Sequence, residues 1–480
     1  MKSEDLYNAV TELRDDQVQA GEKKLRRGRA GDFRRMGAIA AVLAVVILMC
    51  VLAGPWLGAQ LRRSPEQTGA APTESTNAST ANLNKFSLAR ASYSRLAPHS
   101  VHDLTNKEYV PELYGYLRSS LPTLLSGAGD ENRVVSPLNL YVALAMTAET
   151  ADGQTREELL RLLNAPDLET LRDRTNALWR ANYRDNEENF ELLASSLWLR
   201  NNWSYNLETV NRMAEIYYAS VFSGEMGGKD YNETMRAWVN EQTKNLMENQ
   251  LEGIGTGEDD VMALITTTCF QAEWMLEFDP GENEIGVFHG AQGDVSCEYM
   301  HGSEYGVEVC VGNGFIAGEK WLQGNGGSMY FVLPDEGVTP EKLLGREDFL
   351  SFLCGQEGDK GPERKKAVLY LTVPKYDVSS QLSLNEKLKE LGVEEAFDAN
   401  KANFSPLSSE AEGLYLSEVQ HGARLSIDEK GVTGVAFSES IIACAAAEEV
   451  YLTLDRPFLF VVTNNEGLPI FVGIVNNPNA

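Results

Sequence analysis

Residue types that often carry out chemistry are sparse in this chain and do not stand at known catalytic spacings. It has six cysteines and five histidines, with no C-x-x-C pair and no histidine at metal-ligand spacing from a cysteine. The motifs H-E-x-x-H, G-x-S-x-G and G-x-x-x-x-G-K-[ST] are also absent from the sequence. We therefore expect no metal and no cofactor, and the chain offers no motif for a hydrolase or a nucleotide-dependent enzyme. An Asp/Glu pair among the 70 acidic residues stays open.

The cysteines fit a structural role better than a chemical one. Five of the six lie after residue 100, and this odd number argues against a disulfide framework. We interpret four of them as small buried hydrophobes: Cys50, Cys269, Cys297 and Cys310.

One segment near the C-terminus has an unusual composition. From Val432 to Leu454 there is no proline, and the charges are Glu439, Glu448 and Glu449. With the period of two of a β-strand, one face is small and uncharged, comprising Val432, Gly434, Ala436 and Ser438. The other face comprises Thr433, Val435, Phe437 and Glu439. The small, uncharged face suits a strand that enters between two strands of an existing sheet. A slip of one residue would turn Phe437 and Glu439 inward, and burying the unpaired Glu439 carboxylate is costly. An ordinary sandwich strand or a loop has a similar pattern, so these alternatives stay open.

The sequence on both sides of this segment resembles the signature of the serpin family. LYLSEVQHGARLSIDEKGV precedes it, and DRPFLFVVTNNEGLPIFVGIVNNP follows it. Further similarity lies upstream, in VVSPLNLYVALAMTAETADGQT, in Trp238-Val239-Asn240 with Thr243, and in the spacing of Phe270, Trp274, Phe278 and Phe288. It continues at Leu333-Pro334, Pro374-Lys375-Tyr376, Leu391-Gly392, Phe397 and Phe404-Ser405. The resemblance is colinear from about residue 100 to residue 480.

The resemblance implies an α+β fold with three β-sheets, eight to nine helices and an exposed reactive loop. It also implies a suicide-type inhibitor of serine proteases rather than an enzyme. In this family the cleaved loop inserts into the main sheet as a strand and traps the acyl-enzyme. The small face described above is what such an insertion requires.

Carried over residue by residue, the resemblance assigns three groups of residues. The hinge of the loop comprises Glu429, Gly431, Val432, Thr433, Gly434, Val435, Ala436 and Phe437. The reactive bond is Ala445-Ala446, to within one or two residues, and Cys444 is adjacent to it. The gate through which the sheet opens comprises Ser136, His421 and Trp274, with His421 as a hydrogen-bonded structural residue rather than a catalyst.

The chain departs from the family at several of these positions. The family hinge runs through consecutive alanines, whereas Val435 and Phe437 stand here on the outer face and are expected to slow insertion. In the gate, Asn139 and Thr266 occupy positions where the family favours Ser and Asn, and Gly422 replaces a usual Lys. These changes bear on the stability of the uncleaved state more than on the fold.

The expected target is an elastase-like protease. Ala445 suits a shallow primary pocket, because it offers neither a cation for an acidic pocket nor a ring for a deep one. Selectivity among small-pocket proteases should be modest, since one methylene contributes only about 1–3 kcal/mol. The net charge of −28 argues against a nucleic-acid partner and against activation by a polyanion, and it favours cationic proteases. We expect a monomer.

The elements that must position these residues alternate between helical and strand patterns after residue 100. Helical patterns cover 105–126, 136–149, 155–163, 169–184, 206–218, 231–251 and 383–391. Strand patterns include 261–272, 328–333, 367–373, 423–428, 449–453, 458–463 and 469–475. No linker-like break divides residues 100–480, which are therefore predicted to form one domain.

The first hundred residues differ from the rest in charge. They carry 14 basic and 9 acidic side chains, so residues 101–480 carry a net charge of −33. Residues 36–60 begin with 24 residues without a charge, long enough for a transmembrane helix. A basic tail at 1–35 precedes this span, which places the N-terminus in the cytoplasm and the domain outside. Residues 61–99 are rich in Ser, Thr, Ala and Pro and predict a flexible linker.

Other interpretations of the span are less well supported. A cleaved signal peptide would have an unusually long leader, and Leu57-Gly58-Ala59 is a poor cleavage site. Leu48-Met49 before Cys50 lacks the small residue that a lipid-modified cysteine needs, and a buried core helix is rarely so long. The prediction is a signal-anchored, extracellular protein of a bacterial cell membrane. The alternative function is a non-inhibitory serpin-fold surface protein, cleaved as a substrate or acting as a binder.

Overall fold

The computed structural model describes residues 83–91, 110–185, 190–323, 327–354, 361–410, 413–431 and 448–480. No helix in these ranges is long and apolar enough to cross a membrane. The predicted cytoplasmic tail at 1–35 and the predicted span at 36–60 lie outside them.

Two β-sheets form the framework of the described residues. The seven-stranded sheet has the order β1(Ser87–Ala89), β5(Ser220–Gly224), β4(Phe190–Arg200), β6(Met262–Gln271), β13(Glu418–Ile427), β12(Tyr376–Ser383), with β3(Arg184–Asp185) paired to β4. The nine-stranded sheet has the order β14(Glu448–Thr453), β11(Glu363–Pro374), β8(Gly293–Gly312), β9(Phe315–Trp321), β10(Ser328–Pro334), β15(Phe458–Thr463), β16(Pro469–Val475), β2(Arg133–Val135), with β7(Glu284–Gly290) paired to β8.

The helices are concentrated in the first half of the domain, as the sequence patterns predicted. They are α5(Val110–Leu125), α6(Pro137–Thr150), α7(Gly153–Leu162), α8(Leu168–Asn182), α9(Leu207–Ile216), α10(Lys229–Gln242), α11(Pro340–Leu344), α12(Glu347–Leu353) and α13(Asn385–Glu390). Short 3-10 helices lie at η4(Glu248–Gly253), η5(Pro280–Glu282) and η6(Glu395–Phe397). The α+β class is therefore confirmed.

The resemblance implied three β-sheets, whereas the described residues form two hydrogen-bonded sheets. The reason is β8, whose 20 residues pair with β7 at one end and with β9 at the other. Its pairing with β11 shifts register at Gly306, where φ is +68°. A bulge of this kind lets a strand bend without ending, so the two halves of β8 belong to one continuous sheet.

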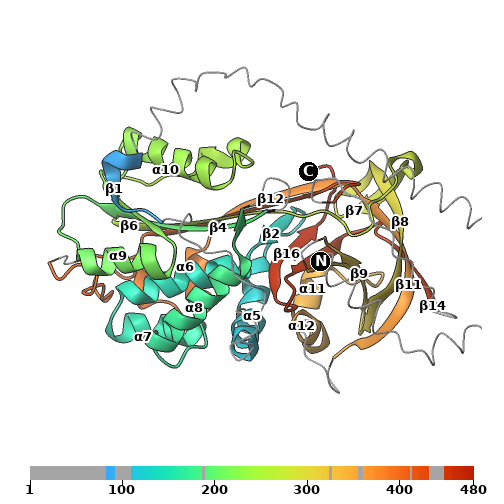
Figure 1. Cartoon of the computed structure of the whole chain (residues 1–480), viewed down its shortest axis with the longest axis horizontal. Helices are drawn as coiled ribbons and strands as arrows, with labels where there is room; N and C mark the ends of the chain where they lie inside the picture. The colour runs from blue at the N-terminus through green and yellow to red at the C-terminus, as the bar shows by residue number, and fades with distance from the viewer. Residues whose placement is uncertain are drawn as a thin grey trace, which may run out of the picture. The chain divides into compact units, whose positions relative to one another are not determined.

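Both faces of the seven-stranded sheet are covered by helices. Figure 1 shows α10 on one face and α6, α8 and α9 on the other. Along β4, Leu193 and Leu197 belong to the main core, whereas Ala194 and Trp198 pack into a second core with α10. A strand that is buried on both faces does not alternate between apolar and polar residues, which explains why the sequence patterns missed β4.

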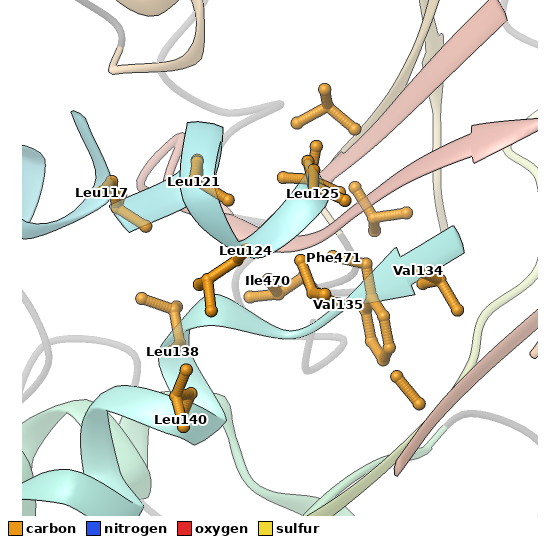
Figure 2. Close-up of a cluster of buried hydrophobic side chains, with 14 of the residues drawn as sticks. Leu117, Leu121, Leu124, Leu125, Val134, Val135, Leu138, Leu140, Ile470 and Phe471 are labelled. Atoms are coloured by element: carbon orange, nitrogen blue, oxygen red, sulfur yellow. The ribbon is translucent and has the colours of Figure 1, made fainter. Parts of the chain in front are cut away.

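The main core continues from the sheets into the helices that precede the site. Leu117, Leu121 and Leu124 of α5 meet Val135 of β2 and Ile470 of β16 in one apolar cluster (Figure 2). All 14 residues of α6 are buried, and the helix begins at Pro137, where the missing N–H of proline is no loss. This core fixes the position of Ser136, the residue that precedes α6.

Two predicted boundaries differ from the structure. The helix predicted at 231–251 ends with α10, because Lys244 and Asn245 adopt positive φ angles of 50° and 64° and break the helical path. Residues 83–91, predicted as part of the flexible linker, include β1, which pairs with β5 and forms the edge of the sheet. The polar composition of 61–99 as a whole concealed the apolar side chains that dock this segment.

Candidate functional site

The predicted reactive segment lies outside the described residues, but both of its attachment points lie within them. The chain is described up to Gly431, just beyond the end of β13, and again from Glu448, the first residue of β14. The predicted reactive bond Ala445-Ala446, the adjacent Cys444 and the hinge positions 432–437 therefore stay predictions. Glu429 and Gly431, the first two hinge positions, can be placed.

The two strands at the centre of the seven-stranded sheet run in the same direction. β13 pairs with β6 in parallel from Glu418 opposite Ala263 to Arg424 opposite Cys269. We call this parallel pairing the seam. A strand that is antiparallel to β13 is also antiparallel to β6, so one additional strand between them would satisfy both neighbours. A segment that follows β13 through a tight turn has this direction.

Such a turn is already present at the end of β13. Gly431 forms antiparallel bridges both with Asp428, just beyond the end of β13, and with Glu273, just beyond the end of β6. The Asp428 side chain accepts hydrogen bonds from the backbone N–H of Lys430 at 2.9 Å and of Gly431 at 3.2 Å. Gly431 thus stands where the first residue of an inserted strand would stand.

Only glycine fits at position 431 in this conformation. Its φ is +140°, and a Cβ atom would lie 2.6 Å from the backbone atoms Ala272 O, Glu273 Cα and Trp274 N. Because these contacts are with backbone rather than with flexible side chains, they cannot be relieved by a rotamer change. The role of Gly431 as the start of the hinge stays a prediction.

A network of charged and amide groups holds the hinge residue Glu429. Its carboxylate lies 2.6 Å from Lys375 Nζ and accepts a hydrogen bond from Asn283. Lys375 and Asn283 also bind the carboxylate of Glu298, at 3.1 Å and 2.9 Å. Burial alone would raise the pKa of Glu429, but the hydrogen bond from Lys375 and the others outweigh it and lower this pKa below its usual value. The hinge is therefore held by a carboxylate that stays ionised.

The segment 274–278 holds the hinge through its backbone. Trp274 N–H donates to Lys430 O at 3.0 Å, and Phe278 N–H donates to Glu429 O at 2.8 Å. Beneath this segment, Lys320 Nζ donates to Leu276 O at 2.7 Å and pairs with Glu304, and both side chains are 1% exposed. The Lys320 ammonium also lies 4.2 Å from the centre of the Phe278 ring and 5.2 Å from that of Trp274. We call residues 273–278 and 428–431 the hinge end.

The three residues predicted to form the gate do not lie together. Ser136 N–H donates to His421 Nε2 at 3.0 Å, and both residues are buried. Trp274 instead donates its indole N–H to Asp428 O at 2.9 Å. Seven residues separate His421 from Asp428, about 23 Å in an extended strand. The structure therefore supports the Ser136–His421 contact and places Trp274 at the hinge end.

A cluster of buried polar side chains surrounds His421 in the middle of the seam. Ser195 of β4, Thr266 of β6 and His421 of β13 are neighbours in one row across the sheet. Asn139 of α6 reaches the same strands, since its amide donates to Thr267 O at 2.7 Å. We call Ser136, Asn139, Ser195, Thr266 and His421 the polar cluster.

Each member of the polar cluster has a buried polar atom without a hydrogen-bond partner among the described residues. These atoms are Ser136 Oγ, Asn139 Oδ1, Ser195 Oγ, Thr266 Oγ1 and His421 Nδ1. Burial lowers the pKa of His421 to about 4, so the imidazole is neutral at pH 7. Because Nε2 accepts from Ser136, the proton of the neutral ring lies on Nδ1.

Sequence reasoning found only part of this site. Asn139 and Thr266 were recognised as departures from the family, but Ser195, Asn283, Glu298 and the Lys320–Glu304 pair were not found. Their partners are 15 to 146 residues away along the chain, so no local pattern could have marked them. Cys269, Cys297 and Cys310 are free and buried, which confirms their interpretation as small hydrophobes, and Cys354 is also buried. Within the described ranges, no group of three or more His, Cys, Asp or Glu side chains is arranged to hold a metal ion.

Comparison with known proteins gives a consistent result. The family model "Serpin (serine protease inhibitor)" matches residues 120–478. An uncharacterized serpin-like protein of Methanosarcina acetivorans is 25% identical over 367 residues, which cover 73% of this chain and 82% of the relative. Neuroserpin of Mus musculus is 27% identical over 400 residues, 78% of this chain and 92% of the relative. The crystal structure of the thermophilic serpin tengpin in the native state covers 82% of this chain and 98% of that chain, with a TM-score of 0.68 and 24% identity, and shares the fold.

Proposed function

The chain belongs to the serpin family, and we propose that it is a suicide-type inhibitor of serine proteases. Serpins are generally protease inhibitors and not catalytic enzymes, and neuroserpin and glia-derived nexin are among the relatives of this chain. In our proposal, the target protease cleaves the segment 432–447, and the N-terminal part of that segment enters the seam as a new strand.

One observation carries this proposal. Gly431 is already bridged in antiparallel fashion to the chain beyond both β13 and β6. Because the seam is parallel, each residue after Gly431 that continued this path would gain two antiparallel neighbours. Insertion is therefore an extension of contacts that exist at the hinge end, rather than a rearrangement of the whole sheet.

The chemistry of the trapped complex comes from the target. The serine Oγ of the protease attacks the carbonyl carbon of Ala445, the bond to the nitrogen of Ala446 breaks, and the protease's own base delivers the proton to the leaving amine. An ester between Ala445 and the protease serine remains. If insertion precedes attack by water, the ester is carried away from the loop's original position and hydrolysis is prevented. This chain would contribute strand insertion and no catalytic group.

The proposed target class follows from the residue before the reactive bond. A methyl group at Ala445 suits an elastase-like protease with a small primary pocket. The acidic domain would attract cationic proteases over long range and repel polyanions. We further propose that residues 36–60 anchor the domain to a bacterial cell membrane as a monomer, with the N-terminus in the cytoplasm. Digestion of intact cells from outside should then release the domain but leave residues 1–35 protected.

The decisive experiment mixes the purified chain with pancreatic elastase and separates the products on a denaturing gel. The proposal expects an adduct that survives denaturation, and N-terminal sequencing of the released peptide should begin at Ala446, to within two residues. Cleavage without an adduct would contradict inhibition and favour the non-inhibitory alternative. An adduct whose released peptide begins elsewhere would correct the reactive bond and leave the mechanism intact.

A substitution on the small face tests whether trapping depends on insertion. We expect Gly434→Arg to be cleaved without forming the adduct, because an unpaired charge cannot enter the sheet without a large desolvation cost. The matched control is Glu439→Arg on the opposite face, which already carries a charge and should keep forming the adduct. Equal trapping by both variants would show that the face assignment is wrong.

A further inference from the structure

Residues 83–91 form an ordered segment on the seven-stranded sheet, ahead of the region that the family model matches. β1 in this segment pairs antiparallel with β5, Ser87 opposite Phe222 and Ala89 opposite Val221. Figure 1 shows β1 beside α10 at the edge of the sheet. The segment thus lengthens the sheet by one strand on the side of β5.

The apolar side chains of this segment complete the core beneath α10. Leu83 is 2% exposed, and Phe86 packs with its ring 5.1 Å from that of Tyr231 in α10. The same small core contains Trp198 of β4 and Trp238 of α10. Removing the segment would uncover this core, so the packing of α10 on the sheet depends on it.

Charged side chains attach the segment to both ends of α10. Arg90 binds both carboxylate oxygens of Glu241 at 3.0 Å, in the last turn of the helix. Lys85 lies 3.5 Å from Asp230, in the first turn. Lys85 lies in a short helical turn before β1, and Arg90 lies just after β1, so the two contacts flank this strand.

The Arg90 contact also offsets an unfavourable interaction between Glu241 and the dipole of α10. The helix has no basic residue in its last turn, where Glu241 lies against the negative end of the helix dipole. The guanidinium of Arg90 supplies the missing cation, and its Nη2 lies within hydrogen-bond distance of both carboxylate oxygens. Strand pairing therefore fixes the segment to β5, and apolar packing and charge hold α10 against the segment.

α10 and the residues that follow it lie across the seam. Ala263 and Ile265 of β6 belong to the core with α10. On the other side of the seam, Gln420 of β13 donates to Gly255 O at 3.3 Å, and the space beside Gly422 is filled by Met247. A strand that enters between β6 and β13 must therefore displace residues 229–255 from at least one of these neighbours.

We propose that residues 83–91 act as a strap that holds α10 on the sheet and thereby slows the entry of a strand into the seam. The slowing rests on the insertion mechanism of the proposed function, whereas the holding of α10 does not. The strap lies on the β5 side of the seven-stranded sheet, which must open for insertion. A change that detaches the strap would then shorten the lifetime of the uncleaved state.

The test exchanges the charges of the Arg90–Glu241 pair in the full chain. Arg90→Glu replaces attraction by repulsion, and we expect amide hydrogen exchange in α10 to become about five- to tenfold faster. Arg90→Glu combined with Glu241→Arg should return to within about twofold of the unmodified chain. The control is Lys229→Glu, an equal charge change on α10. Lys229 pairs with Glu233, and this pair involves no residue of the strap.

Phe86→Ala removes the apolar contact with α10 and should accelerate amide hydrogen exchange in α10 about tenfold or more.

A second measurement follows the conversion of each uncleaved chain, on warming, to a form that melts at a higher temperature. The strap proposal expects Arg90→Glu and Phe86→Ala to convert faster than the unmodified chain, and the charge-exchanged pair to restore the slow rate. Unchanged exchange in α10, or faster exchange with unchanged conversion, would overturn the strap while leaving the proposed function intact. If the unmodified chain does not melt higher even after cleavage within 432–447, insertion itself is wrong. The slowing role then fails with it, whatever the exchange rates are.

Discussion

The hinge end and the polar cluster lie along the same pair of strands but are stabilised in different ways. At the hinge end, Glu429 is paired with Lys375, and beneath it Glu304 is paired with Lys320. In the polar cluster, His421 is neutral and several buried polar atoms have no partner among the described residues. An unpaired buried polar atom costs about 1–3 kcal/mol, so the middle of the seam is held less firmly than its end.

This difference fits the order of events that insertion requires. In the proposed insertion, the hinge end must stay formed, because it would be the template on which the first inserted residues align. The middle must separate, because each inserted residue would take the place of one β6–β13 contact. Groups that are weakly satisfied in the closed seam lose little when it opens. The comparison therefore predicts large effects where paired charges are broken at the hinge end, and pH effects where His421 is buried.

The largest effect is expected from breaking the buried pair beneath the hinge end. Lys320→Met leaves the Glu304 carboxylate buried without its cation, which should cost about 3–5 kcal/mol. The thermal midpoint of the uncleaved chain should fall accordingly, and hydrogen exchange in residues 274–278 should become faster. Lys320→Met combined with Glu304→Leu replaces both charges by apolar groups and should recover most of the loss. Equal destabilisation by the single and the double substitution would show that packing, and not charge, is what Lys320 contributes.

The second effect concerns the pH dependence of the polar cluster. Since burial lowers the pKa of His421 from 6.5 to about 4, protonation is disfavoured in the folded state. Its contribution is complete above pH 6.5 and is lost as pH falls from 6.5 to 4. It amounts to about 3 kcal/mol, because each pKa unit corresponds to about 1.4 kcal/mol. The thermal midpoint of the uncleaved chain should drop across this range.

His421→Gln should remove this pH dependence, because glutamine does not titrate. The control is His289→Gln, since His289 is exposed and its pKa is raised by Asp294, which places its titration above pH 6.5. That variant should keep the full loss between pH 6.5 and 4. If His421→Gln keeps it as well, another group controls the acid sensitivity of the seam.

Sequence alone went furthest where function depends on a single position and its immediate neighbours. The start of α6 at Ser136-Pro137 and a strand ahead of Gly431 could be predicted, because each has a local signature. The partners of Glu429 and Lys320 could not, since an ion pair between distant residues has no local pattern among so many acidic side chains. Trp274 was grouped with His421 because both are family positions. Trp274 lies beyond the end of β6 and contacts Asp428, seven residues after His421, and this separation becomes apparent only in the fold.

The smallest effect on stability is expected from the partly exposed network around Glu429. Glu429→Gln keeps the shape of the side chain but removes the charge, and should cost only about 1 kcal/mol, because Lys375 is partly exposed and keeps Glu298 as a partner. The pKa of Glu429 is lowered in the folded state, so its contribution is present above its ordinary pKa of 4.5 and is lost as pH falls below that value. The local consequence should exceed the global one, because the network positions the residue two before Gly431. We expect hydrogen exchange at Lys430 and Gly431 to rise several-fold while the thermal midpoint barely moves.

The matched control is Glu298→Gln, which removes the other carboxylate of the same network but no hinge residue, and should leave exchange at Gly431 nearly unchanged. If both variants loosen Gly431 equally, the hinge depends on the network as a whole and not on its own carboxylate.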